Sequence, residues 1–471
     1  MNFTFKPRLN IENAVPRHIL ETMHEKALGV LERTGIRVSN GRLLDRIAAK
    51  KGFEMRDGWV RIESGIIEDL VAEVRKRRRG WSNRADEEAL ILSPGYPGCY
   101  HVIDLETNRA VPLTTDRLIE ATKLIDSLYD WGVRGEAPGA PIDIPPKLRR
   151  ILQCKIGYEY CRSAGHAPFE SYEEAVYIKR MAEVMGQGFG IEIYVISPLR
   201  LEGISVDRAI PLLERGECSW MSISSMPLAG ATAPVYPVGA FIQGIAESLG
   251  GYAILHEAYP NIPIDFGINA YHFDMRYGNI VIGSPEQTLL DLFSIGLNMF
   301  YGGGLHGHRS FRTMAKEVDA QAQVEKASSA TVGVLTGTGV FEMSGKLSID
   351  EVFSPVQLVI DCETARYLTR LAKGLEFEDG QIESSLQAMA RCAGKGYYLA
   401  DETTRRDHRN IFWAPSLFDD SLFRTSKGDV DIMEKAKEIC RRKIAEHGYR
   451  LEDERRKRLD EIYAEASRHL S

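Results

Sequence analysis

The sequence predicts an α/β protein built on a closed (β/α)8 TIM barrel, with a small N-terminal α+β module and C-terminal helices. Short β-rich runs alternate with longer helical patterns, and close to eight such units over about 250 residues favour a barrel. No glycine-rich phosphate turn follows the first strand, as the rival open doubly wound sheet would require. We therefore expect a module over 1–114, the barrel over 115–400 and a helical extension over 401–471.

The N-terminal module should begin with an amphipathic helix over 16–34, because its apolar residues form one stripe that ends at Gly35. The expected elements that follow in the module are a helix over 43–50, a strand over 59–62, a helix over 66–77 and a hairpin-like stretch over 101–113. A helix over 115–128 begins the next region. The module is thus expected to end near residue 114.

The barrel should consist of short strands separated by helices. Candidate strands lie at 131–134, 166–169, 191–196, 219–224, 263–268, 298–301 and 331–335, with an eighth within 338–348. Candidate helices lie at 171–186, 205–214, 236–256, 284–296 and 317–329, and the charged tail over 429–471 should form a pair of surface helices. Catalytic groups of a barrel lie at the carboxyl ends of its strands, so the residues that follow each strand are the first candidates.

Composition excludes several classes of protein. Of the 471 residues, 44% are hydrophobic and 27% charged, which is typical of a globular enzyme. The formal charge of −7 argues against nucleic acid as a partner. Seven cysteines without CxxC pairing predict reduced thiols. Neither a signal peptide nor a stretch of about 18 uncharged apolar residues is evident, so we expect a cytoplasmic protein without a membrane contact.

Several polar groups follow the candidate strands. They are Glu136, Glu170, Ser197, Ser225 and the segments 269–274, 302–312 and 336–342. The richest stretch is YGGGLHGHRSFR over 301–312, where glycines stand beside two histidines and two arginines, an arrangement suited to an anion. The loop over 225–235, SMPLAGATAPV, has little side-chain bulk and is stiffened by prolines, so it could form the floor of a ligand site.

Aromatic residues also cluster near the expected strand ends. A quaternary ammonium ion has no N–H donors and is held mainly by ring faces, and an arginine or histidine opposite such a cage would hold a carboxylate. The candidates for the cation are Trp220, Tyr271, Phe273, Tyr301 and Phe341, and those for the carboxylate are His306, His308 and Arg312. Together they fit a betaine, although each ring taken singly is more typical of a packed core.

Two other functions remain open on the residues alone. A metal-dependent lyase or hydrolase could use His272, His306 and His308, although none of these has the spacing of a known zinc motif. A non-catalytic betaine-binding protein would need the same cage without the chemistry. A serine-nucleophile motif GxSxG is absent from the sequence.

Five segments of the sequence resemble the trimethylamine methyltransferase family, whose members are corrinoid-dependent. They are SMPLAGATAPV (225–235), VIDLETNRAVPLTTDRL (102–118), YHFDMRYGNIVIGSPEQTLLD (271–291), VDAQAQVEKA (318–327) and the run over 396–419 that ends in IFWAPSLFD. Their order and spacing also agree with the family, and the resemblance covers most of the chain.

The resemblance implies a barrel that binds an amine and presents one methyl group to the cobalt of a separate corrinoid protein. The corrinoid then belongs to the partner, no cofactor is bound tightly here, no side chain acts as the nucleophile, and a homo-oligomer is expected. Family members that act on trimethylamine carry pyrrolysine, whereas this sequence has only standard residues. The basic stretch over 301–312 also departs from the GG and TDAK of many relatives, so the chain is similar to the glycine betaine, proline betaine and carnitine enzymes.

Overall fold

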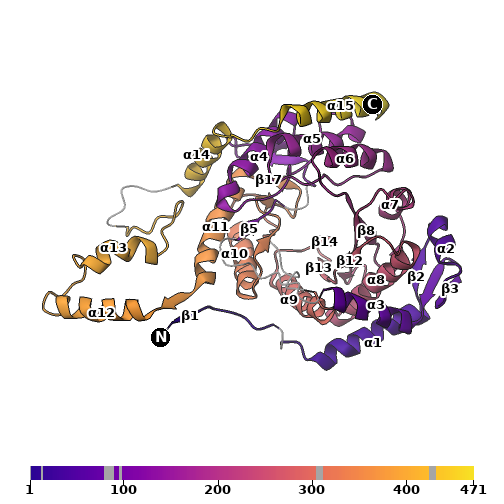
Figure 1. The fold of residues 1–471 in the computed structure, drawn as a ribbon, viewed down its shortest axis with the longest axis horizontal. Helices are drawn as coiled ribbons and strands as arrows, with labels where there is room; N and C mark the ends of the chain where they lie inside the picture. The colour runs from indigo at the N-terminus through magenta and orange to yellow at the C-terminus, as the bar shows by residue number, and fades with distance from the viewer. Residues whose placement is uncertain are drawn as a thin grey trace.

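The computed structural model describes residues 2–11, 14–78, 90–94, 98–303, 311–423 and 431–470. Figure 1 shows short strands in the middle of the molecule with helices arranged around them, the N-terminal helices on one side and the C-terminal helix on another. Two helices, α12 (Asp379–Cys392) and α13 (Glu402–Ile411), extend away from the rest of the protein. The main body thus consists of strands enclosed by helices, as expected of an α/β fold.

Three parallel strands form the most regular sheet. Strand β10 (Trp220–Ser225) lies between β8 (Gly190–Val195) and β12 (Ile264–Phe266). Side chains alternate between the two faces of the sheet along each strand. One face carries buried apolar residues, and the other carries polar residues that are less buried, namely Glu192, Ser222, Ser224 and Asp265. The sheet therefore presents one apolar face to the helices and one polar face to the interior of the molecule. The strands predicted over 191–196, 219–224 and 263–268 are confirmed.

Other parallel pairs join distant parts of the chain. Strand β15 (Val340–Phe341) pairs with β5 (Ile91–Leu92), and Leu92 also bridges Val133. Strand β17 (Val352–Phe353) pairs with β6 (His101–Ile103), which forms a hairpin with β7 (Ala110–Pro112). Strand β5 thus lies within the first 114 residues but pairs with a strand from the second half of the chain.

Helices alternate with these strands through the middle of the chain. They are α4 (Thr115–Ser127), α5 (Arg149–Tyr160), α6 (Tyr172–Val184), α7 (Ile204–Glu214), α8 (Pro237–Ala258), α9 (Pro285–Phe300), α10 (Ala320–Leu335) and α11 (Pro355–Lys373). Side chains of Ser171, Ser284, Asp319 and Ser354 accept hydrogen bonds from the first turns of α6, α9, α10 and α11. The six helices predicted between 115 and 329 are confirmed.

Three predicted strands, over 166–169, 298–301 and 331–335, are wrong. The segments 298–301 and 331–335 are not strands but continue the helices α9 and α10. Both are short apolar runs, and such a run is compatible with a buried strand or with the buried side of a helix. The segment 166–169 has no strand, and within 131–134 only Val133 forms a bridge, after a 3-10 turn over Tyr129–Trp131.

The N-terminal module has the predicted elements. Helix α1 (Arg17–Arg33) is followed by β2 (Ile36–Val38), α2 (Gly41–Ile47), β3 (Phe53–Arg56), β4 (Trp59–Ile62) and α3 (Ser64–Arg77). Gly35 has a φ of 81°, and a Cβ atom there would lie 2.3 Å from the carbonyl oxygen of Val60, so the turn from α1 to β2 needs glycine. The module packs against the main body through contacts of α1, α2 and α3 with α8.

The remaining elements are short strands spread along the chain, a 3-10 turn and the two C-terminal helices. They are β1 (Phe3–Phe5), β9 (Arg200–Leu201), β11 (Leu228–Ala229), β13 (Tyr271–Asp274), β14 (Asn279–Ile280), β16 (Lys346–Leu347), β18 (Leu375–Phe377), the 3-10 turn Pro146–Leu148, α14 (Ile432–Ala445) and α15 (Asp453–Leu470). Helix α14 packs on α4 and α11, and α15 packs on α5 and α6, so the predicted pair of tail helices is confirmed.

Helix α8 is long and apolar enough to span a membrane, as judged by length and composition alone. However, 78% of the apolar window is buried inside the protein, where α8 packs against α1 and the sheet. A buried helix at the core of a globular protein has the same composition. All seven cysteines are free, and six of them are buried, which confirms the predicted absence of disulfides.

Candidate active site

The loop that follows β10 is a compact turn. The backbone N–H groups of Ala231, Thr232 and Ala233 all donate to the carbonyl oxygen of Leu228, and the Thr232 hydroxyl accepts from the Leu228 N–H at 3.0 Å. Strand β11 of this loop pairs in parallel with β13, the strand that begins at Tyr271. The small-residue loop thus connects a strand end to α8, where the sequence predicted a ligand floor, and lies beside Tyr271.

Arg312 lies where acidic and phenolic groups converge. The Tyr271 side chain and the charges of Asp291 and Glu342 act on its guanidinium. Burial lowers the pKa of Arg312, but these neighbours outweigh burial and raise it above its ordinary value. The Nε atom of Arg312 is buried and has no hydrogen-bond partner among the described residues. A fixed cation with an unused buried donor is suited to a carboxylate ligand.

Glu136 and Glu342 are neighbouring carboxylates. Glu136 follows the strand predicted over 131–134, and Glu342 follows the observed strand β15. Burial raises the pKa of Glu136 to about 7, the charge of Lys346 opposes this shift, and Glu342 adds to it. Lys346 is fully buried, and its ammonium group donates to the Pro138 carbonyl and lies 3.3 Å from the Cys99 sulfur. Because Glu342 also acts on Arg312 and Tyr271, these groups form one electrostatic cluster, the strand-end cluster of Glu136, Tyr271, Arg312 and Glu342.

A cavity of about 340 Å³ lies against the polar face of the parallel sheet. Its lining consists of Arg78, Glu192, Ser222, Ile223, Ser224, Asp265, Phe266, Gly267, Asn269, Asn298 and Gly303. Its volume lies near the lower end of the range for small-molecule sites. Glu192 of this lining acts on the pKa of Tyr271, as Arg312 does, so Tyr271 links the cavity to the strand-end cluster.

Helix α10 fixes the backbone on both sides of Arg312. The Lys326 ammonium group is 1% exposed and donates to the carbonyl oxygens of Phe311 at 2.7 Å and Met343 at 3.2 Å, and to the Asp361 carboxylate at 2.9 Å. The next segment is held by Glu325, which accepts from the Thr313 hydroxyl at 2.6 Å and the Met314 N–H at 2.7 Å. These two residues of the VDAQAQVEKA segment thus position Arg312 and the neighbouring Glu342.

A buried carboxylate on α8 holds two other strand-end loops. Glu247 is fully buried and accepts from the Ser197 hydroxyl at 2.7 Å and the Leu199 N–H at 2.9 Å. Gln243 donates both to Glu247 and to the carbonyl oxygen of Thr232, each at 2.8 Å. Burial raises the pKa of Glu247, while these hydrogen bonds lower it. The loops after β8 and β10 are therefore tied to one helix.

Tyr271 and Phe273 follow a confirmed strand, as the sequence predicted, whereas the strand predicted before Arg312 is the end of α9. Tyr271 and Phe273 are half-buried and, being two residues apart, face the same side of β13. Arg312 and Tyr271 influence each other's pKa, so one predicted cation residue and one predicted carboxylate residue lie near each other. Whether these side chains bind a ligand stays a prediction.

Three other predicted rings do not converge with them. Trp220 is the first residue of β10, at the opposite end of that strand from the loop, and its ring lies over Gly190. Tyr301 is fully buried at the end of α9, with its hydroxyl 2.9 Å from Nδ1 of His24 on α1. Phe341 is fully buried with its ring edge-on to Phe311. A cage made from all five predicted rings is therefore wrong, because these three serve as packing residues.

His306 and His308 lie outside the described residues, so their predicted role stays a prediction. His272, proposed with them for a metal site, has its Nδ1 atom 2.9 Å from the Ser284 hydroxyl, and its backbone N–H donates to the side-chain oxygen of Gln287. Within the described ranges, groups of three or more His, Cys, Asp or Glu side chains placed to hold a metal ion are absent.

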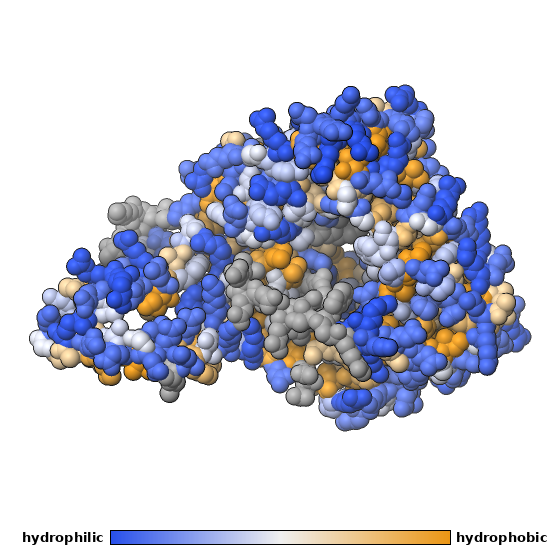
Figure 2. All heavy atoms as spheres, in the orientation of Figure 1, coloured by the Kyte–Doolittle hydropathy of each residue, from blue (hydrophilic) through white to orange (hydrophobic). Residues whose placement is uncertain are grey.

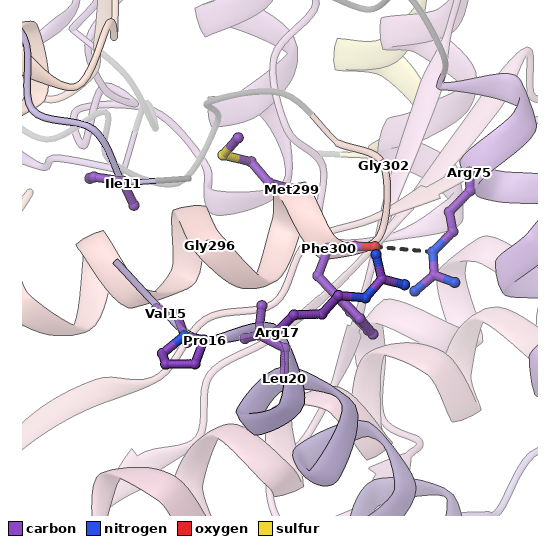
Figure 3. A pocket seen from close by; sticks show the side chains of 10 residues that line it. All are labelled: Ile11, Val15, Pro16, Arg17, Leu20, Arg75, Gly296, Met299, Phe300 and Gly302. Carbon is purple, nitrogen blue, oxygen red and sulfur yellow. Dashed lines mark hydrogen bonds between the residues drawn. The ribbon is translucent and has the colours of Figure 1, made fainter. Parts of the chain in front are cut away.

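A larger pocket, of about 570 Å³, lies on the outside of the main body between α1 and α9 (Figure 3). Figure 3 shows Arg75 pointing toward Phe300, to whose carbonyl oxygen its Nε donates at 3.0 Å. The Arg75 guanidinium also lies 4.6 Å from the ring of Phe300, so its charge is already satisfied. This pocket contains no carboxylate and is not formed by strand ends, so we place the active site at the strand-end cluster.

Sequence reasoning did not identify some residues of the site and did not single out others. Glu136 and Glu342 were in the predicted strand-end segments, but acidic residues are too common for composition to single them out. Lys326, Lys346 and Asp291 were not predicted, because each comes from outside those segments and reaches the cluster only through folding. The available signal was the position of Asp291 and Lys326 in segments that resemble the family (271–291 and 318–327).

Comparisons with known proteins extend over nearly the whole chain. The model of the trimethylamine methyltransferase (MTTB) family matches residues 7–469. Glycine betaine methyltransferase of Desulfitobacterium hafniense (strain Y51) is 24% identical over 436 residues, covering 88% of each chain. L-carnitine:corrinoid methyltransferase of Eubacterium limosum is 23% identical over 453 residues, covering 89% of this chain and 90% of the relative. The crystal structure of Methanosarcina barkeri monomethylamine methyltransferase (MtmB) aligns with a TM-score of 0.43 at 10% identity, covering 92% of this chain and 88% of that one.

Proposed function

This chain belongs to the trimethylamine methyltransferase family, and from that premise we propose that it transfers a methyl group from a betaine-type quaternary amine to the Co(I) of a corrinoid protein. The observation that carries the proposal is the strand-end cluster, where a half-buried Arg312 lies near Tyr271 and two carboxylates, and where its buried Nε has no hydrogen-bond partner among the described residues. An arginine next to carboxylates offers partners for both charges of a zwitterion.

The substrate carboxylate binds Arg312, and the ammonium head lies on the side of Glu136 and Glu342. Arg312 uses for this contact its Nε–H, which has no partner among the residues that the structure describes, and Tyr271 lies beside the guanidinium. Tyr271 and Phe273 present ring faces from one side of β13, while the carboxylates supply the larger attraction for the cation. Relative to the sequence prediction, acidic groups thus replace most of the aromatic cage.

The chemistry requires no nucleophilic side chain. The bond between nitrogen and one methyl carbon breaks, its electron pair stays on nitrogen, and a neutral tertiary amine leaves. The cobalt of the partner protein supplies the attacking electron pair when it is present. This chain fixes the C–N bond so that the methyl group points toward the side from which the corrinoid protein approaches. It also keeps the two charges of the substrate paired with charged groups of the site. Lys326 and Glu325 act as positioning residues, because they hold the backbone around Arg312.

The corrinoid protein docks where the loop after β10 is exposed. Large apolar side chains on the surface of this loop, the start of α8 and the β13–β14 hairpin are Met226, Val235, Tyr236, Val238, Met275 and Tyr277. Exposed apolar patches of this kind are typical of protein–protein contacts. The adjoining residues from 229 to 233 are small, which leaves room for a large group to approach the backbone.

The proposal includes the finer predictions on fold, location and assembly. The parallel groups β15–β5 and β8–β10–β12 are parts of one closed (β/α)8 barrel, between the predicted module over 1–114 and the helical extension over 401–471. The pairing of β5 with β15 extends that barrel into the end of the first region. The protein acts in the cytoplasm, binds no cofactor tightly and works as a homo-oligomer.

Anaerobic mixing of the protein with a reduced corrinoid protein tests the function. Glycine betaine is expected to cause a loss of the Co(I) absorbance that requires the enzyme, whereas trimethylamine should cause no loss. Free cob(I)alamin serves as a second acceptor when the partner is limiting. Co(I) absorbance that persists with every quaternary amine, although glycine betaine binds in a titration, would make the protein a betaine binder and refute methyl transfer.

Betaine binding should tighten as the pH rises through about 7. The pKa of Glu136 is about 7, so its carboxyl is mostly neutral near pH 6 and mostly ionised near pH 8. If the cation requires the ionised form, the Kd for glycine betaine falls about tenfold over this range, in proportion to the ionised fraction. Calorimetric titrations at several pH values measure this. Glu136→Gln should flatten the profile, and identical profiles for variant and wild type would exclude Glu136 as the cation partner.

A further inference from the structure

Lys346 is a charged side chain in the interior of the protein. Hydrophilic side chains cover most of the face of the molecule that Figure 2 shows, where their charges are in water. Lys346 of β16, in contrast, is 0% exposed. A buried ammonium group costs free energy unless acceptors or an opposite charge compensate it. The neighbours of Lys346 therefore indicate why a charge is kept at this position.

The ammonium group of Lys346 holds the loop that carries Glu136. It donates to the carbonyl oxygen of Pro138, two residues beyond Glu136, and to the Cys99 sulfur at 3.3 Å. The Cys99 thiol donates to the same Pro138 carbonyl at 2.9 Å, and the Ala140 N–H donates to the Cys99 carbonyl at 3.1 Å. Two fully buried side chains thus converge on one backbone oxygen of this loop.

The backbone on either side of Glu136 is also fixed. The carbonyl oxygen of Gly135 accepts a hydrogen bond from the Cys161 thiol at 3.0 Å. The side chain of Gln153 on α5 donates to the carbonyl oxygen of Ala137 at 3.1 Å. The Glu136 side chain itself is only half-buried. A half-exposed carboxylate on a backbone held by buried groups is an arrangement suited to contact with a ligand.

The charged groups near Glu136 act on it in opposite directions. Lys346 favours the ionised carboxylate, and Glu342 opposes it, because two like charges close together resist being ionised at once. Further titratable groups that face Glu136 come from α5 and the residue after it, and they are Cys154, Tyr158 and Cys161. Burial raises the pKa of each of these three well above neutral, so they carry no charge. Lys346 is therefore the cation that offsets Glu342 at this carboxylate.

We propose that Lys346 is a positioning residue of the cation subsite, whose ammonium group fixes the loop of Glu136 and keeps that carboxylate charged beside Glu342. Both carboxylates can then face the ammonium head of the substrate. Lys346 acts through Glu136 and does not itself bind the substrate. The proposal rests on the proposed function, in which Glu136 attracts the quaternary amine, and it explains how two neighbouring carboxylates can be ionised together.

The pH dependence of cation binding tests this role. Choline is the probe, because it has the quaternary ammonium group without a carboxylate for Arg312. Lys346→Gln keeps a donor for the Pro138 carbonyl but removes the charge, and should move the midpoint of the Kd-against-pH curve upward by about one pH unit or more. Cys99→Ala removes the other side-chain donor to that carbonyl but keeps the charge, and should leave the midpoint unchanged. Weaker binding of Lys346→Gln at every pH, with the wild-type midpoint, would mean a purely structural role and overturn the proposal.

A second measurement needs no ligand. Infrared spectra of the ligand-free protein follow the protonated carboxyl of Glu136, with Glu136→Gln to assign its band. In wild type the band should disappear as the pH rises through about 7, and in Lys346→Gln only at higher pH. Identical titrations would overturn the proposal. A shifted titration in a protein that binds neither choline nor glycine betaine would support the action of Lys346 on Glu136 and refute the proposed function instead.

Stability distinguishes this effect from a general folding defect. Without Lys346, the pKa of Glu136 in the folded protein rises further above its unfolded value, so stability should be lost as the pH rises. Lys346→Gln should therefore unfold at a lower denaturant concentration above pH 7 than below it, and Glu136→Gln as a second change should restore most of the loss. A double variant that is as unstable as Lys346→Gln would show that the lysine does not act through Glu136.

Discussion

An Arg312→Met variant is expected to bind glycine betaine about tenfold or more weakly than the wild-type protein. Methionine retains much of the length of arginine but removes the charge and every N–H donor, including the buried Nε that lacks a partner among the described residues. The loss corresponds to one charge-assisted contact with the substrate carboxylate. Isothermal titration calorimetry at constant pH measures the two dissociation constants.

Two comparisons make this result specific. Arg276→Met removes an arginine from the nearby β13–β14 hairpin, where Arg276 is exposed and paired with Asp274, and should leave the Kd unchanged. Choline, which has the quaternary ammonium group without the carboxylate, should bind wild type and Arg312→Met equally. Equal weakening for choline and glycine betaine would mean that Arg312 acts on the shape of the site, and an unchanged isotherm would exclude it from the site.

Replacing Lys326 with methionine should lower the free energy of unfolding by about 3–5 kcal/mol. Lys326 and Asp361 form an ion pair in which both side chains are 1% exposed, so removing one partner leaves an uncompensated buried charge. The substitution also removes the donor to the carbonyl oxygens of Phe311 and Met343. Chemical denaturation, followed by circular dichroism, measures the effect. Glycine betaine binding should weaken too, because the backbone around Arg312 loses its anchor.

A surface pair provides the matched control. Lys179→Met removes the same type of side chain from the exposed i,i+4 pair with Glu183 on α6, where a loss of about 0.3–0.5 kcal/mol is typical. The double variant Lys326→Met/Asp361→Leu removes both charges of this pair. Most of the lost stability should therefore return, while betaine binding stays weak. If Lys326→Met unfolds at the same denaturant concentration as Lys179→Met, the buried pair does not stabilise the fold.

The helices were more predictable from sequence than the strands. The amphipathic patterns of α1 and α6 extend over several helical turns, so their period is clear in the sequence. Their predicted boundaries agree with the structure within about three residues. The segments 298–301 and 331–335 are too short for a period to show, and the helices before them simply continue. The pairing of β5 with β15 joins residues almost 250 positions apart, which no local pattern encodes.

The candidate site was predictable where chemistry follows a strand. Tyr271 comes after a strand that the structure confirms, whereas the strand expected before Arg312 is the end of α9, and the two residues lie near each other in the structure. Trp220 failed because an aromatic residue near a strand gives no information on which end of the strand it occupies. Tyr301 failed because the segment that carries it ends a helix and packs on the N-terminal module through His24. Lys346 lies in strand β16, within the range predicted for the eighth strand, but its contact with the Pro138 carbonyl arises only through tertiary packing.

The most direct measurement is the amine product of a single turnover with a reduced corrinoid protein. Equal amounts of protein, Co(I) and glycine betaine are mixed anaerobically, and the amine is analysed by mass spectrometry alongside a parallel reaction with choline. Glycine betaine is expected to lose one methyl group and yield dimethylglycine in an amount equal to the Co(I) consumed, with choline reacting about tenfold or more slowly. Recovery of intact glycine betaine, or equal demethylation of choline, would contradict a site in which Arg312 holds the carboxylate of a quaternary amine for methyl transfer.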